Sequence, residues 1–244
     1  NLPPPWGGAG NGREGPRLML AALADALGLL LAGDPALWGI IGLSLSVSLA
    51  ASGIAAVVGV PAGAALAVLR FPGRRGAVVA VNALLGLPPV VVGLALYLLL
   101  SRAGPLGALG LLFTPAAMVL AQAVLAAPVV MALAHRAAAG AWAALGDELQ
   151  MDGAGRLRAV PVLLRTVPGG VLTAVLAGFG RTVSEVGAIL VVGGNIAGHT
   201  RTMTTAVALE TARGNLAVAM ALGMVLLGIS LAVNAIAFRV AGRD

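Results

Sequence analysis

Arg181 and Glu185 are the two residues of this chain whose types and spacing are best suited to chemistry. They stand four residues apart and carry the only charges in the apolar run Thr166–Thr200. At this spacing both side chains lie on one face of a helix, where a guanidinium and a carboxylate neutralise each other. An ionisable residue inside an apolar segment is equally a candidate for handling a charged solute. The sequence leaves both interpretations open.

Residue types that are missing exclude other chemistries. The chain has no Cys, and all 15 of its basic residues are Arg. Without lysine, neither a G-x-x-x-x-G-K-[ST] phosphate loop nor a Schiff base can form. His135 and His199 are far apart and offer no cluster at metal-ligand spacing. We therefore expect no catalytic residue, metal or cofactor here, and any energy source must lie on another chain.

The composition indicates that membrane helices position the Arg181–Glu185 pair. Of 244 residues, 59% are hydrophobic and 10% are charged, with a mean hydropathy of +1.01. Soluble domains are roughly 45–50% apolar and about 25% charged, and disordered chains are less apolar still. The net charge of +6 comes from arginines clustered between apolar runs, which is typical of membrane flanks rather than of nucleic-acid binding.

Long gaps between charges locate the membrane spans, because about 20 apolar residues cross a bilayer as a helix. Four runs carry no charge, and a fifth is interrupted only by Arg181 and Glu185. We predict an all-α integral membrane protein with about five transmembrane helices, within Pro35–Leu69, Gly76–Ser101, Ala103–His135, Thr166–Thr200 and Gly214–Phe238. The pair would lie on one continuous helix.

Residues 1–34 are expected to form a tail and a helix lying flat on the membrane surface. The segment Leu18–Ala32 is too short to cross, and one helical face carries Leu20, Leu23, Leu27 and Leu30, opposite Asp25. A cleaved signal peptide is the alternative. Residues 35–244 would then be the transmembrane domain.

Arginine placement in the short loops predicts the orientation. The cytoplasmic group would be Arg70, Arg74, Arg75, Arg136, Arg156, Arg158, Arg165, Arg239 and Arg243, and the outer group Arg13, Arg17, Arg102, Arg201 and Arg213. With an odd number of spans, the N-terminus would lie outside and the C-terminus in the cytoplasm.

Prolines and small residues predict a closely packed bundle. Neighbouring helices must satisfy the carbonyls freed by Pro61, Pro88–Pro89 and Pro128. Small residues at four-residue spacing would allow close contact; these are Ser44 and Ser48, and Ala55, Gly59 and Gly63. Asn82 and Gln122 are expected to hydrogen-bond between helices.

The longest polar stretch follows the third span, and its informative part is residues 143–160. It contains an acidic turn, two glycines and a basic turn, which predict a helix, a tight corner and a second helix. Its charges would suit docking on another protein, through Asp147, Glu148, Leu149, Gly153, Ala154 and Arg156. A solvated loop would look similar.

The stretch Asp147–Gly153 resembles the Glu-Ala-Ala-x-x-x-Gly signature of permeases in ATP-binding-cassette (ABC) importers. Asp147 replaces the Glu, and Glu148-Leu149 replaces Ala-Ala. Other stretches are similar to the permeases for molybdate and tungstate, namely Phe71–Arg74, Leu87–Gly93 and Phe179–Ala188. The resemblance to the tungstate branch is carried by Gly193–Ile196, Thr200–Ala206 and Leu209–Thr211.

This resemblance implies a type I importer (MetI-like) permease fold in the inner membrane. Two permease copies would form the pathway, two cytoplasmic ATPases would hold ATP and Mg²⁺ and dock on residues 143–160, and an extracytoplasmic binding protein would deliver the oxyanion. The pathway residues would be Arg181, Ser184, Glu185 and Gly187. The outer mouth or binding-protein contact would involve Asn195, Thr200, Arg201 and Thr202.

Other functions remain open at this stage. The substrate could instead be molybdate or sulfate, because the three are nearly isosteric tetrahedral anions. An ATP-independent channel or secondary transporter is disfavoured by the absence of a clear internal repeat and by the odd number of spans. A membrane scaffold without transport activity is disfavoured by the Arg181–Glu185 pair and the doubled prolines.

Overall fold

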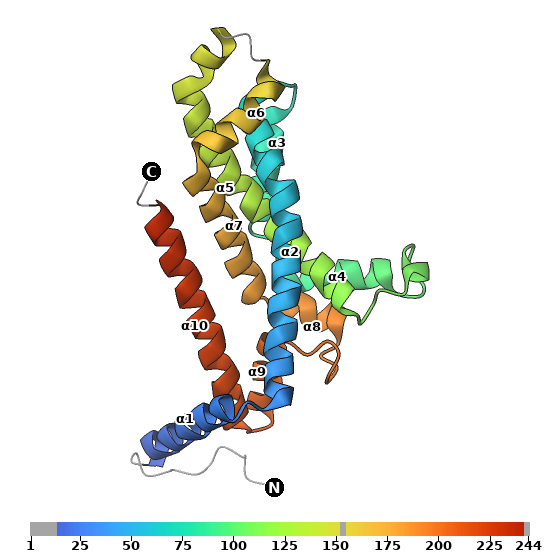
Figure 1. The fold of residues 1–244 in the computed structure, drawn as a ribbon. Coiled ribbons are helices and arrows are strands. Elements are labelled where there is room, and N and C mark those ends of the chain that lie inside the picture. The colour runs from blue at the N-terminus through green and yellow to red at the C-terminus, as the bar shows by residue number, and fades with distance from the viewer. Residues whose placement is uncertain (1–13, 152–154, 242–244) are drawn as a thin grey trace.

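Long helices running side by side dominate the fold, and shorter helices lie across them (Figure 1). The computed structural model describes residues 14–151 and 155–241, and no strand occurs within these ranges. The helices are α1 (Glu14–Ala32), α2 (Pro35–Val68), α3 (Arg74–Leu84), α4 (Pro89–Leu100), α5 (Pro115–Met151), α6 (Arg156–Thr166), α7 (Pro168–Val183), α8 (Gly187–Gly193), α9 (Met203–Ala212) and α10 (Leu216–Ala241), with a 3₁₀ turn η1 (Gly107–Leu109).

The structure has three to five candidate membrane spans, and the predicted number of about five is reached when each bent helix pair is counted as one span. Three helices, α2, α5 and α10, are long and apolar enough to cross a bilayer. Two bent pairs bring the number to as many as five: α3 with α4, bent by 100°, and α6 with α7, bent by 83°. The chain is thus an all-α, multi-pass membrane protein.

The close contact predicted from small residues is found between α2 and α5. A Cβ atom added to Gly59 would meet the carbonyl oxygen of Ala127 at 3.1 Å. One added to Gly63 would press on the carbonyl of Met131 and lie 2.9 Å from the amide nitrogen of His135. Because glycine has no side chain, the two backbones pack directly against each other.

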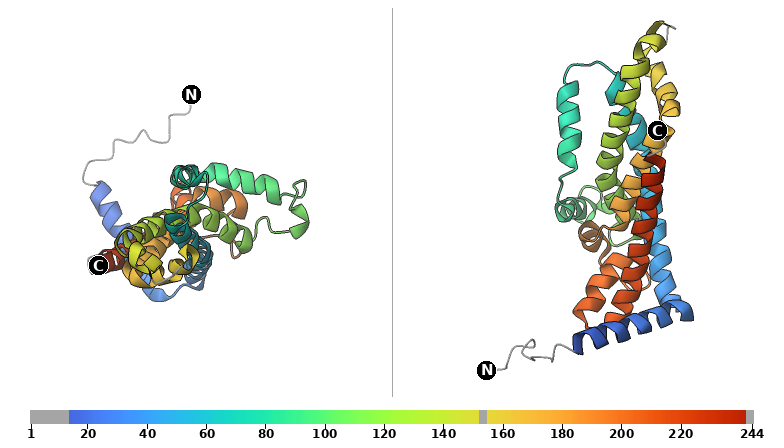
Figure 2. Two further views of the ribbon diagram at one scale, coloured as in Figure 1. Left: turned by 90° about the horizontal axis from the view of Figure 1, so that it is seen from above. Right: turned by 90° about the vertical axis from the view of Figure 1, so that its left-hand side faces the viewer.

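The predicted span Gly76–Ser101 is broken rather than continuous. Helix α3 ends at Leu84 and α4 begins at Pro89, after Pro88 in extended conformation with ψ 122°. Proline cannot continue a helix hydrogen-bond ladder, so the pair Pro88–Pro89 ends one helix and starts the next. As a result α4 projects sideways from the bundle (Figures 1 and 2).

The third span is displaced along the sequence from its predicted position. The range Ala103–His135 was expected to be helical, but residues 101–114 form a loop with the turn η1, and α5 begins only at Pro115. Helix α5 then continues beyond His135 to Met151. It therefore carries the first part of the polar stretch away from the bundle without interruption.

The single helix expected to carry Arg181 and Glu185 is also interrupted. Helix α7 ends at Val183 and α8 begins at Gly187, so Glu185 lies in the short link between them. The prediction of one continuous helix was wrong because side chains of other helices satisfy the backbone at this break, as described below.

The N-terminal helix α1 lies across one end of the bundle, at the foot of α2 and α10 (Figures 1 and 2). Ala26 is buried, Leu30 is half-buried against the cluster around α10, and Leu31 is 87% exposed. Leu27, expected on the same face as Leu30, is 48% exposed. An apolar surface at the bundle end remains uncovered in the single chain, which fits a helix at a membrane interface.

Candidate functional site

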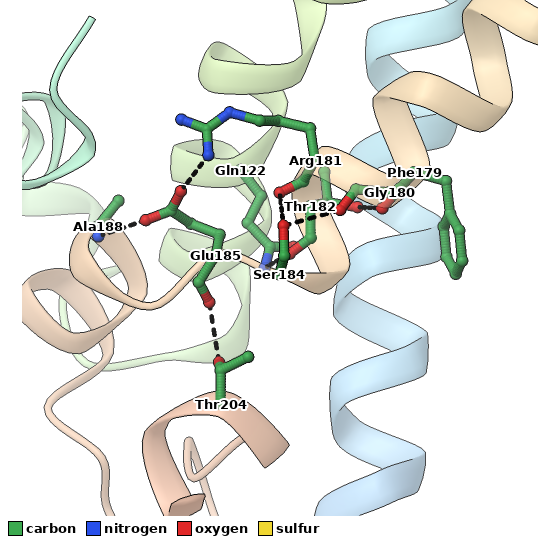
Figure 3. A network of polar contacts seen from close by, with 9 residues as sticks. All are labelled: Gln122, Phe179, Gly180, Arg181, Thr182, Ser184, Glu185, Ala188 and Thr204. Carbon is green, nitrogen blue, oxygen red and sulfur yellow. Dashed lines mark hydrogen bonds and ion pairs between the residues drawn. The ribbon is translucent and has the colours of Figure 1, made fainter. Parts of the chain in front are cut away.

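The break between α7 and α8 is organised by an ion pair. The Arg181 guanidinium donates from Nη1 to Oε2 of Glu185 at 2.9 Å (Figure 3). The Glu185 side chain is only 3% exposed, whereas that of Arg181 is 30% exposed. The carboxylate is therefore neutralised inside the protein, and the guanidinium keeps an accessible side.

Glu185 is also held by the two helices that follow it. Its Oε1 accepts from the amide of Ala188 in the first turn of α8 at 3.2 Å, and its backbone carbonyl accepts from Thr204 Oγ1 of α9 at 2.8 Å (Figure 3). A buried carboxylate is tolerated where it is both paired and hydrogen-bonded. Glu185 is thus a structural joint between α7, α8 and α9.

Side chains of α5 and α2 complete the joint. Gln122 Nε2 donates to the carbonyl of Thr182 at 3.0 Å, and the hydroxyls of Thr182 and Ser52 are 3.0 Å apart. The expectation that Gln122 bonds between helices is confirmed. Asn82 was expected to do the same, but it is exposed and donates to Val78 within its own helix at 2.8 Å, so that prediction was wrong.

Helices α4 and α8, which follow the two breaks, pack closely on each other. A Cβ atom on Gly187 would meet Val90 Cγ2 at 2.7 Å, and one on Gly93 would meet the Cα of Ala188 at 2.8 Å. Gly187 therefore acts as a contact point between the broken segments. Among residues predicted for the pathway, Glu185 is buried and Gly187 is half-buried in this contact.

Arg181 and Ser184, the other two predicted pathway residues, face open space. They line a cavity of about 610 Å³ between α7 and α10, with Val129 of α5 at its wall. The cavity is also lined by polar residues that we did not predict: Thr173, Ser230 and Asn234. Ser230 and Asn234 are polar residues four apart on the apolar helix α10, and this spacing was the signal that could have identified them.

The four residues predicted for the outer mouth differ in burial: two are buried and two are half-buried. Thr200 is 1% exposed and its hydroxyl donates to the carbonyl of Gly193 at 2.6 Å, while Thr202 is 3% exposed and forms a capping box with Thr205 at the start of α9. Both hydroxyls stabilise the chain itself, and neither side chain reaches the surface.

Asn195 and Arg201 are half-buried in the same loop. Asn195 has a positive φ of 51° and its Nδ2 is 3.5 Å from the carbonyl of Thr205, a marginal contact. Arg201 lines a cavity of about 300 Å³ together with residues 197–199 and the first turns of α2. The exposed part of this loop is Ile196–His199, rather than the threonines that follow it.

The polar stretch after the third span forms two helices at the end of the bundle opposite α1 (Figure 1). We refer to residues 143–160 as the coupling hairpin. Asp147 and Glu148 are exposed and Leu149 is half-buried; Gly153 and Ala154, at the predicted corner, lie outside the described residues. Met151 and Leu157, on either side of the corner, are 79% and 68% exposed.

Two arginines attach this end of the molecule to the last turn of α2. Arg156 of the coupling hairpin donates to the carbonyl of Val68 at 3.1 Å, and its guanidinium lies 5.9 Å from the ring centre of Trp142. Arg74 of α3 donates to the carbonyls of Leu66 at 2.7 Å and Ala67 at 3.1 Å. The final carbonyls of a helix lack intrahelical partners and carry negative partial charge, so arginines stabilise them.

Comparisons with known proteins agree with the resemblance seen in the motifs, although no protein-family model matches the chain. The chain is 39% identical to the tungstate uptake system permease protein of Peptoclostridium acidaminophilum, over 87% of this chain and 93% of that protein. It is 40% identical to a probable anion ABC transporter permease protein of Haloferax volcanii, over 81% and 87% respectively. It is 38% identical to the tungstate uptake system permease protein of Campylobacter jejuni, over 63% and 64%. These similarities extend over nearly the whole length of the first two relatives, and with the helical membrane fold they show that the chain belongs to the anion permease family of ABC transporters.

Proposed function

We propose that this chain is the transmembrane permease subunit of an ATP-driven importer for tungstate. The observation that carries the substrate is the 39% identity to a tungstate uptake permease over 93% of that relative's length. The cavity beside Arg181 supports an anionic substrate, because it offers a positive charge and no carboxylate among its described lining residues. Molybdate and sulfate, which have the same charge and shape, are the alternatives to be tested.

ATP hydrolysis in this proposal takes place on two partner ATPase subunits that dock on the coupling hairpin. The chain has no lysine for a phosphate-binding loop. Met151 and Leu157, at the end of α5 and near the start of α6, are largely exposed. Exposed apolar side chains flanked by Asp147, Glu148 and Arg158 are suited to a protein interface with an apolar centre and a charged rim.

Two copies of the permease would form the pathway, and an extracytoplasmic binding protein would deliver the anion at the end that carries α1. A single chain leaves much of α10 uncovered, with Leu231 and Phe238 62% and 81% exposed. Its cavity beside Arg181 is likewise open. Residues 35–244 would form this transmembrane domain, preceded by the interfacial segment 1–34.

The mechanism would be an alternation between two packings of the bundle, biased from both ends. ATP binding would draw the ATPases together, and the coupling hairpins would transmit that motion to α2 through Arg156. The loaded binding protein would favour the outward-open packing from the other side. Arg181 would lower the barrier for a divalent anion, while its pairing with Glu185 would limit the depth of binding so that the anion is released.

In this proposal the distribution of the arginines determines the orientation of the chain in the membrane. Arg70, Arg74, Arg75, Arg156 and Arg158 flank the end with the coupling hairpin, which would be cytoplasmic, and Arg201 and Arg213 flank α9 at the end that carries α1. The C-terminal end of α10 would then lie toward the cytoplasm and the N-terminus outside, in the cell membrane.

The decisive experiment is ATP turnover and uptake by the reconstituted complex of permease, ATPase and binding protein. The binding protein would be loaded in turn with tungstate, molybdate and sulfate. We expect tungstate-loaded protein to stimulate ATP turnover and to drive accumulation in vesicles. Equal stimulation by all three anions would contradict selectivity for tungstate, and accumulation by vesicles that contain the permease alone would contradict the ATP-driven mechanism.

A further inference from the structure

The cavity between α7 and α10 combines several hydrogen-bond donors in an otherwise apolar setting. Its polar lining consists of Arg181, Thr173 and Ser184 from α7 and the link after it, and Ser230 and Asn234 from α10. The remaining wall is made of small and apolar residues: Val129, Leu176, Ala177, Gly180, Val233 and Ala237. The polar groups therefore come from two helices that face each other across the cavity.

Several of these donors are not used inside the protein. A guanidinium has five N–H groups, and a single bond from Arg181, the one to Glu185, is found within the described part of the chain. The Thr173 hydroxyl oxygen is buried and has no hydrogen-bond partner among the described residues. A buried polar atom without a partner is costly, and a bound water or ion is one explanation for such an atom in a native protein.

Asn234 is the most informative residue because of its position on α10. It is exposed, and one of its two amide N–H groups is used by a bond to the Ser230 carbonyl at 2.8 Å. The second N–H has no hydrogen-bond partner among the described residues, and Asn234 lines the cavity. An amide facing lipid tails is unfavourable, so Asn234, which lies within the candidate span Leu216–Val240, indicates a polar partner or a water-filled space beside it.

The cavity has the size and charge for a hydrated anion. One water molecule takes up about 30 Å³ in the liquid, and the cavity volume is about 610 Å³. Its only charged lining residue among those described is Arg181, and Glu185 is turned into the packed joint, where it neutralises one side of that guanidinium without entering the cavity. A divalent tetrahedral oxyanion has four acceptor oxygens, which suit a set of separate N–H and O–H donors.

We infer that this cavity is a transient binding site for the transported oxyanion, in which Asn234 and Ser230 bind the anion together with Arg181. The inference rests on the proposed function and deepens it, because it adds α10 to the pathway. Donors on both helices make the site sensitive to the α7–α10 separation. A change in that separation during the transport cycle would then weaken binding and release the anion.

The test compares Asn234→Asp with Asn82→Asp in the full complex of permease, ATPase and binding protein. Both asparagines are exposed and donate to the carbonyl four residues earlier at 2.8 Å, but only Asn234 lines the cavity. Asn234→Asp places a carboxylate beside the anion, so tungstate uptake should fall on the order of tenfold or more. Asn82→Asp should transport at the wild-type rate.

A second variant and a binding measurement complete the test. Asn234→Leu removes the donor without adding charge and should also lower uptake, while size-exclusion chromatography shows whether each complex assembles. Equilibrium dialysis of the purified permease–ATPase complex with tungstate, without binding protein, should show weaker binding in both Asn234 variants. Wild-type uptake and binding in an assembled Asn234→Leu complex would overturn the inference. Wild-type complex that binds tungstate in dialysis but does not transport it would contradict the proposed function alone.

Discussion

The Arg181–Glu185 pair is asymmetric, and this asymmetry defines its role. The Glu185 carboxylate is buried and accepts from the Ala188 amide of α8, and the backbone carbonyl of Glu185 accepts from Thr204 of α9, whereas the Arg181 guanidinium faces the cavity. The Arg181 side chain is 30% exposed, against 3% for that of Glu185. Glu185 thus stabilises the break between α7 and α8, and Arg181 presents positive charge to the cavity.

Removal of one or both charges separates these two contributions. Arg181→Ala leaves a buried carboxylate unpaired and should destabilise the complex by roughly 3 kcal/mol, toward the low end for buried pairs because Arg181 is partly exposed. The double variant Arg181→Ala, Glu185→Gln should recover most of that loss and still fail to transport. Thermal unfolding in detergent and tungstate uptake measure the two effects. Recovery of transport together with stability would show that the pair is only structural.

The residue scale also shows what the sequence could predict. Gln122 and Asn82 are both amides in apolar runs, and the same expectation was applied to both. Gln122 reaches Thr182 because α5 lies against α7, whereas Asn82 is on a short exposed helix and bonds to its own backbone. A polar side chain within a span requires a hydrogen-bond partner, but tertiary packing decides which partner is within reach.

At the scale of elements, the two helix breaks differ in how far the sequence signals them. The bend between α3 and α4 can be predicted from the sequence, because the pair Pro88–Pro89 by itself ends one helix and starts the next. The link after Val183 contains no proline, and Arg181 and Glu185 at four-residue spacing favour a continuous helix there. Bonds from Gln122 and Thr204, which lie far away in the sequence, stabilise this second break.

The α2–α5 contact gives a prediction with an internal control. Gly63→Ala would force the two backbones apart, because the new Cβ would press on Met131 and His135. We expect a loss of about 1–3 kcal/mol. Gly53→Ala on the same helix meets nothing within 4 Å, and should be neutral or stabilising by up to about 1 kcal/mol. Unfolding midpoints of the two variants check this, and equal midpoints would contradict direct backbone packing.

At the scale of the whole molecule, the two ends of the bundle are chemically different. One end carries α1 and α9, and the other carries the coupling hairpin with its exposed Met151 and Leu157 (Figure 1). The arginine pattern predicted this division from the sequence. Met151 is the last residue of α5, whose unbroken extension the sequence did not reveal, and Leu157 lies in the first turn of α6.

Docking of the ATPase should depend on the apolar tip of the hairpin. Leu157→Asp should greatly reduce the amount of ATPase that copurifies with the permease, because a charge would be buried at the interface. Leu109→Asp in η1, where the leucine is 60% exposed and far from the hairpin, is the control and should retain the ATPase. Retention of ATPase by Leu157→Asp would place the docking surface elsewhere.

The orientation can be tested with single cysteines, since the chain has none of its own. In right-side-out vesicles a membrane-impermeant maleimide should label Arg213→Cys and leave Arg158→Cys unlabelled until the vesicles are opened. Both arginines lie in regions exposed at opposite ends of the bundle. The reverse labelling pattern would invert the proposed topology.

The two arginines bonded to the last turn of α2 would determine how a movement of the coupling hairpin reaches the rest of the protein. Arg74 binds α3 to the carbonyls of Leu66 and Ala67, and Arg156 binds the coupling hairpin to the next carbonyl, that of Val68, so a movement of either part would act on the same turn of α2. Helix α2 has 34 residues and is therefore on the order of 50 Å long, so it connects the two ends of the bundle. Near its far end, the Ser44 hydroxyl accepts from the first amide of α9, at Met203, at 2.6 Å. A movement of the coupling hairpin would therefore be transmitted along α2 to α9, whose Thr204 hydroxyl donates to the backbone carbonyl of Glu185.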